Sequence, residues 1–502
     1  MTSRLSAATL GQVLPQVQVP GYSAEAAAIG VVHLGVGNFF RAHQAAYLDQ
    51  AMNDGARGWG ICGVSLRNPA TRDALLAQDN FYALVERDGI SDSARVVGSL
   101  RELLVAGEDP ERVVARMAAP ATRWVSLTIT EKGYGHLAGS RDTRIDPAHP
   151  DLARDLTGRK GGDSQVSPCS AVGLIHAALV RRLRDAAGPL TVLSCDNLSC
   201  NGDLLRALVL AFDEAVGGGA SAWIQDQVKF PNSMVDRIVP RTTTGDRALV
   251  RGLVGLDDVW PVVTEPFRQW VIEDRFAGPR PPLERYGVQI VRDVRPYEAM
   301  KLRLLNAAHS AIAWLCVPAG MTTVDAAVAE PAIREFIERL WLDIIPGLEP
   351  EVVDAAPAYC ASLLARFDNR GLAHRTAQIA MDGSQKLPLR LLPSIRVNLE
   401  RGLPVQRLAA VVAAWINYLR GVAEDGSAFE PDDPLRDTLQ AIAQTADADE
   451  AVRKMFQQSA IFGDLAANAS LQRSVARCLA RLQSTGSLAT VNGLNEAAVG
   501  SS

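Results

Sequence analysis

The sequence predicts an α/β protein in which an N-terminal domain built on a parallel sheet is followed by a mainly α-helical C-terminal domain. Up to about residue 290, short apolar and β-branched runs alternate with segments of helical periodicity, a pattern typical of a parallel sheet covered by helices. From Pro296 onward nearly every segment has helical periodicity. We therefore expect domains at 1–290 and 291–502, with the active cleft at their junction, where ligand sites commonly lie.

The bulk composition argues against several classes of protein. Of the 502 residues, 48% are hydrophobic and 21% charged, and the net charge is −5. This balance gives no reason to expect a nucleic acid or an anionic membrane as a partner, and no stretch approaches the ~20 apolar residues of a membrane-spanning helix. Seven single cysteines without CxxC pairs argue against a disulfide scaffold and a structural zinc site. We expect a cytoplasmic protein that is a monomer or a weak oligomer.

The first predicted strand ends in a glycine-rich turn. An apolar run that begins at Ile29 reaches a Gly-x-Gly turn and passes into a helical pattern. Backbone N–H groups at such a turn can hold a pyrophosphate, as in a Rossmann-type dinucleotide-binding domain. Phe40 replaces the third glycine of the usual fingerprint, and a plain glycine turn is the alternative. The residues that we expect near the cofactor here are Gly35, Gly37, Asn38, Phe39 and Arg41.

The second predicted strand, at 59–66, leaves the choice of nucleotide open. In a dinucleotide-binding fold an acidic residue at the end of this strand binds the adenosine ribose. Here Arg67 follows the strand, and no acidic residue occurs before Asp73. Arg67 or Arg72 could reach a 2′-phosphate, or both could be solvated loop residues. We expect NAD as the cofactor, with NADP as the open alternative.

Polar residues follow two later strands of the predicted sheet. Strands are predicted where β-branched and aromatic residues cluster, at 81–85, 95–100, 124–130 and 190–194. The third of these ends at Thr130 and Glu131, at the sheet edge that lines the cofactor cleft of open α/β sheets. The fourth is followed by Asp196, Asn197 and Asn201, of which we expect one to be structural, since Asp and Asn are good helix caps. The polar, glycine-rich segment 139–168 predicts a loop.

The C-terminal half opens with a predicted helix, 296–317, whose apolar surface is interrupted by three polar residues. At ~100° per residue on an α-helix, Lys301, Asn306 and His309 fall in one sector. Buried polar groups are costly unless they are partnered, and a lysine in such a place can have a pKa low enough to lose its proton near neutral pH. The alternative is a lysine that extends its amine to solvent. We take this helix as the candidate catalytic element.

The roles on this helix follow from the chemistry of its side chains. Lys301 could take the hydroxyl proton of an alcohol while hydride leaves to a nicotinamide. Asn306 and Asn197 could donate hydrogen bonds to the developing alkoxide, and His309 could orient the lysine or bind a substrate hydroxyl. The motifs of rival chemistries, GxSxG and HExxH, are absent, and no metal site is predicted. Further helices are predicted at 331–345, 358–366, 372–380, 388–401, 405–422, 433–445, 448–457 and 469–483.

Seven separated motifs occur in order between about residue 10 and residue 480. They are Gly35-x-Gly37-x-Phe39-x-Arg41-Ala-His43-Gln, Thr128-Ile-Thr-Glu131-Lys-Gly-Tyr134, Ser194-Cys-Asp-Asn197, Met234-Val-Asp236-Arg237-Ile, Glu265-Pro-Phe267, Lys301-x4-Asn306-x2-His309 and Asp382-Gly-Ser-Gln-Lys386-x-Pro. Together they resemble the motifs of the polyol-specific long-chain dehydrogenases, a family with mannitol, arabinitol and sugar-acid branches.

The resemblance implies an activity as well as a fold. It implies a metal-independent enzyme that has a Rossmann-type N-terminal domain and an α-helical C-terminal domain. It also implies NAD(P)-dependent oxidation of a secondary hydroxyl of an acyclic polyol, with D-mannitol to D-fructose as the first choice. Lys301 matches the family's general base, and Asn197 and Asn306 match its alkoxide-stabilising amides.

Further positions match residues of the family that serve the proton path and the substrate. Glu298, one turn before Lys301, matches a carboxylate implicated in passing the proton to solvent. Asp236, His309 and Lys386 fall where the family contacts substrate hydroxyls. The expected partner is therefore a small-molecule polyol or sugar acid.

The sequence departs from the mannitol pattern near the last motif. Mannitol-type members place an arginine four residues before Asp382, and here that residue is Gln378. The surrounding run looks more like the mannonate branch, and Arg375 could bind a carboxylate, although a charge on a helix surface is an equal alternative. Oxidation of D-mannonate to D-fructuronate is the alternative reaction. A nucleotide-binding regulator without catalysis is the alternative from another class.

Overall fold

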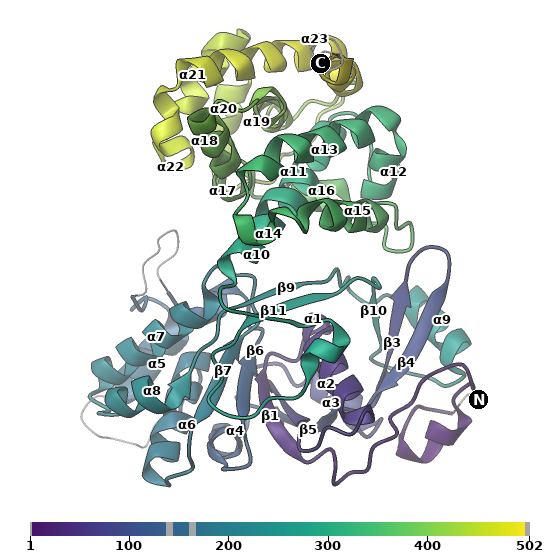
Figure 1. Ribbon diagram of the computed structural model, residues 1–502, viewed down its shortest axis with the longest axis vertical. Coiled ribbons are helices and arrows are strands. Elements are labelled where there is room, and N and C mark those ends of the chain that lie inside the picture. The colour runs from purple at the N-terminus through teal and green to yellow at the C-terminus, as the bar shows by residue number, and fades with distance from the viewer. Residues whose placement is uncertain (1–2, 137–143, 160–166, 497–502) are drawn as a thin grey trace. The chain divides into compact units, whose positions relative to one another are not determined.

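A computed structural model of the protein describes residues 3–136, 144–159 and 167–496 (Figure 1). The chain divides into two compact units, Met1–Arg295 and Pro296–Ser502. Strands and helices alternate in the first unit, and the second unit is helical. The predicted fold class is therefore confirmed. Among the described residues, no helix is both long enough and apolar enough to cross a membrane.

The first unit is organised around a six-stranded parallel sheet with the order β5-β2-β1-β6-β7-β8. Its strands are β1 (Ile29–Leu34), β2 (Gly60–Ser65), β5 (Leu100–Val105), β6 (Trp124–Leu127), β7 (Leu190–Ser194) and β8 (Val228–Lys229). The chain runs outward from β1 in one direction through β2 and in the other through β6. The carboxyl ends of β1 and β6 therefore flank the topological switch point, where open α/β sheets bind ligands.

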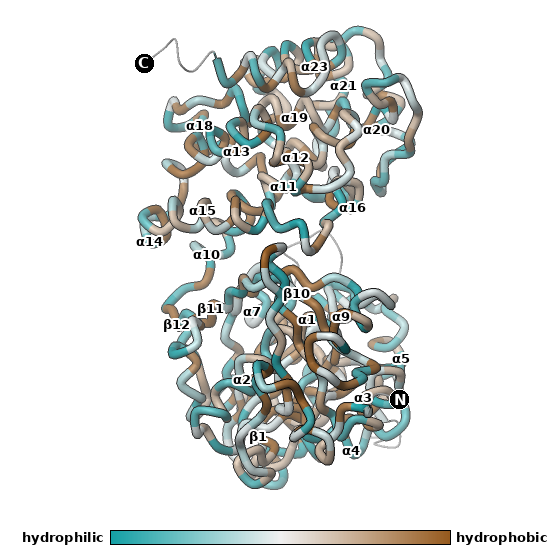
Figure 2. The backbone as a smooth tube through the Cα atoms, turned by 90° about the vertical axis from the view of Figure 1, so that its right-hand side faces the viewer, coloured by the Kyte–Doolittle hydropathy of each residue, from teal (hydrophilic) through white to brown (hydrophobic). Residues whose placement is uncertain are grey.

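Successive side chains of β1, a central strand of this sheet, point into two different hydrophobic cores. Val32 and Leu34 pack in one core with α4 (Pro110–Ala118), α6 (Ala171–Arg184) and α7 (Asn201–Val216). Val31 packs in the other, with α1 (Asn38–Ala42) and α2 (Gln44–Asn53). Figure 2 shows hydrophobic stretches of chain gathered around α1 and β10 (Val262–Thr264). Burial on both faces explains why these strands are almost continuously apolar.

Two three-stranded sheets complete the first unit. One has the order β10-β3-β4 and the other β12-β11-β9. Their remaining strands are β3 (Tyr82–Arg87), β4 (Asp92–Val97), β9 (Ser233–Asp236), β11 (Gln269–Glu273) and β12 (Gln289–Val291). The other helices of this unit are η1 (Ala7–Gln12), α3 (Ala70–Leu76), η2 (Glu131–Tyr134), α5 (Pro150–Arg159), α8 (Ser221–Gln227), α9 (Thr244–Val254) and η3 (Leu283–Tyr286).

Two local predictions for this unit are wrong. The strand predicted at 95–100 is divided, because β4 ends at Val97 and β5 begins at Leu100. Between them a Cβ on Gly98 would lie 2.6 Å from the Phe81 ring, and the Gly98 N–H donates to a buried carboxylate instead of a neighbouring strand. The loop predicted at 139–168 contains α5, and its parts at 139–143 and 160–166 lie outside the described residues.

The second unit packs around α11 (Ala307–Cys316) and α19 (Gln406–Leu419). Every residue of α11 is buried, as is every residue of α19 from Leu408 onward. The α19 helix packs against α23 (Ala469–Glu496) and α11. The other helical elements are α10 (Arg295–Met300), a π-helical turn (Lys301–Asn306), α12 (Val324–Ala329), α13 (Pro331–Ile344), η5 (Ile345–Gly347), α14 (Pro350–Val353), α15 (Ala356–Phe367), α16 (Thr376–Ala380), α17 (Gly383–Arg390), α18 (Leu392–Arg401), α20 (Arg436–Ala443), α21 (Ala448–Phe456), α22 (Ser459–Phe462) and η6 (Gly463–Ala467).

Candidate active site

The glycine turn after β1 leaves its backbone open to a ligand. Gly35 has a φ of +98°, and a Cβ there would lie 2.0 Å from the carbonyl oxygen of Thr128, so only glycine fits. Gly37 follows with an extended backbone, φ −88° and ψ 180°. A Cβ on Gly37 would meet no atom of the described residues within 4 Å. This combination of close strand packing and open backbone suits the approach of a phosphate.

Arg41 is engaged inside the fold. Its side chain is 1% exposed and donates to the carbonyl oxygen of Trp260 and, at 2.7 Å, to Oδ1 of Asn38. The guanidinium also lies 5.1 Å from the centre of the Tyr82 ring. Burial lowers the pKa of Arg41 to about 10. These contacts argue against the direct cofactor contact that the sequence predicts for Arg41, whereas Phe39 is half-buried beside the turn.

The two arginines after β2 are both paired with carboxylates. Arg67 forms an ion pair with Asp151 of α5, and Arg72 pairs with Glu108 and, at 2.7 Å, with Asp73. The side chain of Arg67 is 75% exposed. Because exposed ion pairs contribute little free energy, a bound phosphate could displace Asp151 from Arg67.

Of the three polar residues predicted after β7, one is exposed and two are buried. Asn197 is exposed, whereas Asp196 is 8% exposed and Asn201 is fully buried. The amide of Asn201 donates to the carbonyl oxygens of Asp196 at 2.9 Å and Ser233 at 2.8 Å, and it accepts the Ser233 N–H at 2.9 Å. Asn201 thereby ties the loop to β9. Asp196 and Asn201 therefore both make buried structural contacts, where the sequence predicts one such residue, and Asn197 is the exposed member of the three.

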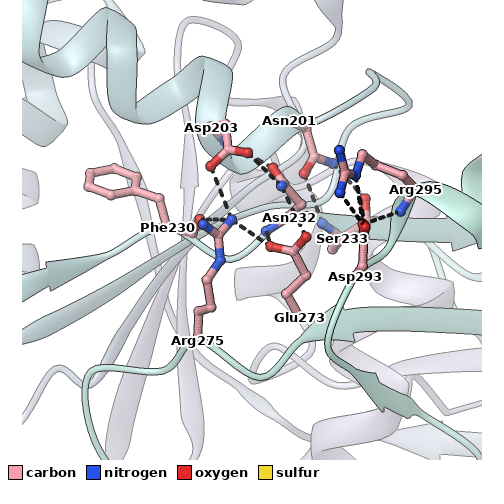
Figure 3. Close-up of polar contacts among 9 residues, drawn as sticks. All are labelled: Asn201, Asp203, Phe230, Asn232, Ser233, Glu273, Arg275, Asp293 and Arg295. Carbon is pink, nitrogen blue, oxygen red and sulfur yellow. Dashed lines mark hydrogen bonds and ion pairs between the residues drawn. The ribbon is translucent and has the colours of Figure 1, made fainter.

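Asp236 ends β9, opposite Gln269 of β11, and is 6% exposed. A polar network holds this strand pair to the start of α7 (Figure 3). The side-chain amide of Asn232 donates to Asp203 at 2.8 Å and to Glu273 at 3.3 Å. Arg275 pairs with the same two carboxylates. The strand that carries Asp236 is therefore held by β11 and, through Asn232, by the start of α7.

The candidate catalytic helix contains a π-helical turn at Lys301–Asn306, which corrects the regular α-helix predicted there. The N–H of Ala307 bonds to the carbonyl oxygen of Leu302, five residues earlier. A π turn holds more residues than the 3.6 of an α-helix, so each residue advances by a smaller angle around the helix axis. The angle between Lys301 and Asn306 is therefore smaller than the regular α-helix predicts. Single π turns are frequent at functional sites.

Two side chains from other helices stabilise the π turn. Trp341 of α13 donates its indole N–H to the carbonyl oxygen of Leu304 at 3.0 Å. Arg390 of α17 donates to the carbonyl oxygen of Asn306 at 3.3 Å and to the hydroxyl of Ser310 at 3.1 Å. These donors add hydrogen bonds to buried main-chain oxygens of the irregular turn, and the carbonyl oxygen of Leu304 accepts the N–H of Ala307 as well.

The polar side chains of this helix are buried. Lys301, Glu298 and His309 are 8%, 9% and 7% exposed. Within the described part of the chain, Nε2 of His309 is buried without a hydrogen-bond partner, and the ring packs on Phe367 at 4.9 Å and His374 at 5.4 Å. Burial, followed by the charges of its neighbours, lowers the pKa of His309 well below 6.5. A neutral imidazole with an unpartnered nitrogen can bond to a substrate hydroxyl.

The two remaining predicted substrate contacts differ in environment. Lys386 of α17 is half-buried; its amine donates to the carbonyl oxygen of Ile379 at 3.2 Å and lies 3.9 Å from Asp382. Burial lowers the pKa of Lys386. Arg375, at the start of α16, is exposed, and so is Gln378. In the described ranges no three His, Cys, Asp or Glu side chains group so that they could hold a metal ion.

Comparison with known proteins identifies the family. The family model of the mannitol dehydrogenase Rossmann domain matches residues 29–285, and that of the mannitol dehydrogenase C-terminal domain matches residues 293–483. The chain belongs to the mannitol dehydrogenase family. The resemblance inferred from the seven sequence motifs is thereby confirmed.

Relatives of this mannitol dehydrogenase family member match it along nearly its whole length. The mannitol 2-dehydrogenase of Phaeosphaeria nodorum is 42% identical over 470 residues, which cover 92% of this chain and 80% of the relative. The structure of Pseudomonas fluorescens mannitol 2-dehydrogenase in ternary complex with NAD and D-mannitol matches with a TM-score of 0.82, 36% identity, and coverage of 98% of this chain and 99% of that one. A substrate-free D-sorbitol dehydrogenase matches with a TM-score of 0.89, 32% identity, and coverage of 98% and 100%.

Sequence reasoning missed three features of the site. The π turn lies in an apolar segment whose periodicity resembles that of an α-helix over so few residues. Arg390 lies two residues after Pro388, the last residue of the final motif, and its spacing of four residues from Lys386 was an available signal. Asp196 also contacts the turn after β6. The two partners in that turn precede Asp196 by 66 and 67 positions in the sequence, and no local pattern predicts contacts over such a separation.

Proposed function

We propose that this protein is an NAD-dependent, metal-independent polyol dehydrogenase that oxidises a secondary hydroxyl of an acyclic polyol, with D-mannitol to D-fructose as the preferred reaction. The observation that carries the proposal is the similarity, over 98% of this chain, to the Pseudomonas fluorescens enzyme whose structure contains NAD and D-mannitol. The buried Lys301 supports it, because a general base of this type needs shielding from water.

The residues of the first unit fit a dinucleotide. Gly35 allows β1 and the end of β6 to approach closely, and Gly37 leaves the backbone of the turn accessible. Both glycines lie at the switch point of the sheet, where this fold class places a pyrophosphate. A nicotinamide cofactor held by this turn would supply a hydride acceptor for the carbon that carries the reacting hydroxyl.

Four side chains supply the acid–base chemistry in this proposal. The amine of Lys301 takes the hydroxyl proton as the hydride leaves the same carbon, so the alcohol becomes a ketone and loses two electrons and two hydrogens. Side-chain N–H groups of Asn197 and Asn306 donate to the oxygen while negative charge develops on it. Glu298, buried one turn before the lysine, passes the proton on to solvent.

Four side chains are proposed to hold the substrate. His309 offers an unpartnered ring nitrogen, and Asp236 a carboxylate that can accept from substrate hydroxyls. Lys386 can donate a hydrogen bond from its amine, and the exposed Arg375 can reach a polar end of the substrate. These groups bind hydroxyls without requiring a metal ion.

Oxidation of D-mannonate to D-fructuronate is the second candidate. It is favoured by Gln378 in place of the arginine of mannitol-type members, and by the nearby Arg375 and Lys386, which could bind a carboxylate. A regulator without catalysis is the third.

Purified protein tests these candidates when it is incubated with NAD or NADP and D-mannitol, D-sorbitol or D-mannonate, while the absorbance of the reduced cofactor is followed. We expect the fastest reduction with NAD and D-mannitol. Reduction with D-mannonate alone would refute the mannitol assignment, and no reduction with any substrate would favour the regulator.

A further inference from the structure

Thr130 has a backbone conformation that threonine rarely adopts. It follows β6, and its φ of 63° and ψ of 162° lie in a region populated almost only by glycine, so a residue with a Cβ is strained there. Within the described residues it is the one β-branched residue with a positive φ. Gly133 and Gly135 occur in the same turn, so glycine is used nearby but not at the strained position.

The carboxylate of Asp196 accepts the two peptide N–H groups that flank Ile129, and the second of them is the N–H of Thr130 itself. Oδ2 accepts the N–H of Ile129 at 3.0 Å, and Oδ1 accepts the N–H of Thr130 at 2.8 Å. The hydroxyl of Tyr134 also donates to Oδ2, at 2.8 Å. Because Asp196 is 8% exposed, these charge-assisted bonds face little competition from water. They can therefore offset the conformational cost at Thr130.

The residue that braces Thr130 also precedes Asn197. The carbonyl oxygen of Asp196 accepts a hydrogen bond from Asn201, which is itself bonded to Ser233 of β9. Asp196 is thus held through its side chain to the turn after β6 and through its main chain to β9. The position of the exposed Asn197 depends on this fixed neighbour.

We propose that Asp196 is a positioning residue: by bracing the strained backbone at Thr130, its carboxylate fixes both the turn after β6 and the adjacent Asn197 for hydride transfer. This inference rests on the proposed function, which gives Asn197 its role toward the substrate oxygen. The brace is needed because of the Cβ of Thr130. A glycine at position 130 adopts the same backbone without support.

A rescue experiment tests whether the backbone at Thr130 needs the carboxylate of Asp196. In Asp196→Asn the side chain keeps its shape, but an NH2 group now faces one of the two peptide N–H groups. We expect kcat with D-mannitol to fall at least tenfold, by a larger factor than any rise in KM, and NAD to bind more weakly. Adding Thr130→Gly should restore kcat at least fivefold, whereas Thr130→Ala should not. Both second substitutions remove the threonine hydroxyl, so the comparison isolates the Cβ.

Urea unfolding of the same proteins separates this inference from the proposed function. The midpoint of Asp196→Asn should fall, and glycine at position 130 should raise it again while alanine should not. Equal effects of glycine and alanine on kcat and on the midpoint would overturn the inference. If Asp196→Asn does not fold, recovery of folded protein by glycine alone supports the brace, and recovery by neither refutes it. An inactive wild-type protein would refute the proposed function, yet the midpoints would still decide on the brace.

Discussion

Replacing Gly37 with alanine separates the stability of the glycine turn from its role in cofactor binding. The backbone at Gly37, φ −88° and ψ 180°, suits alanine, and a Cβ there meets nothing within 4 Å among the described atoms. Because alanine reduces the freedom of the unfolded chain, we expect the free energy of unfolding to be unchanged or up to ~1 kcal/mol higher. The same methyl group projects into the space in which phosphates would approach the turn. We therefore expect the Kd for NAD to rise at least tenfold.

Two matched substitutions control for the addition of a methyl group to glycine. Gly35→Ala places a Cβ 2.0 Å from the Thr128 carbonyl oxygen at a φ of +98°, so we expect a loss of more than ~2 kcal/mol of stability. Gly252→Ala lies inside α9, where the added Cβ has open space among the described residues. It should raise the free energy of unfolding by up to ~1 kcal/mol and leave NAD binding unchanged.

The assay needs two measurements for each protein. Urea unfolding without ligand gives the free energy of unfolding, and titration with NAD, followed by tryptophan fluorescence, gives the Kd. The reasoning is refuted if Gly37→Ala is stable and binds NAD with wild-type affinity, because the glycine turn would then not be where the phosphates bind.

Three further predictions concern the π turn, pH and metal. Trp341→Phe removes the indole donor to the carbonyl oxygen of Leu304, which keeps its bond from the N–H of Ala307, so the free energy of unfolding measured in urea should fall by ~0.5–1.5 kcal/mol and kcat should fall severalfold. An unchanged kcat would show that the turn does not depend on Trp341. Burial raises the pKa of Asp49 to about 6, above its value in the unfolded chain, so the native state gains stability as pH falls through about 6 and loses it as pH rises. As the pH is lowered from about 7.5 to 5, the free energy of unfolding of the wild type should therefore rise by ~1.4 kcal/mol relative to that of Asp49→Asn. If the free energies of unfolding of the two proteins, measured in urea, change with pH in parallel, the raised pKa of Asp49 is contradicted. EDTA should leave the rate of NAD reduction unchanged, and inhibition that is reversed by zinc would overturn the metal-free scheme.

Local patterns were sufficient to predict the parts of the fold that depend on neighbouring residues. The glycine turn at Gly35 follows a buried strand directly, and its glycines reflect a backbone requirement that can be read from the sequence. The buried helix at Lys301 was identified because polar residues on an apolar helix are costly. Both features arise within about ten residues of chain, where periodicity and turn chemistry dominate.

Contacts between distant segments could not be predicted in this way. The inward orientation of Arg41 depends on the carbonyl oxygen of Trp260, which lies 219 residues away. The π turn depends on donors from Trp341 and Arg390, and hydrophobic periodicity cannot distinguish it from an α-helix over six residues. The strain at Thr130 likewise depends on a carboxylate contributed by a later strand end. These features follow from tertiary packing rather than from local sequence.

The role of Lys301 as general base is the central claim, and the most direct test is the rate of NAD reduction by Lys301→Ala with saturating D-mannitol. Loss of acid–base catalysis should lower kcat by roughly two or more orders of magnitude, while NAD binding and the urea midpoint remain close to those of the wild type. A kcat within a few-fold of wild type would contradict the assignment of Lys301 as the general base.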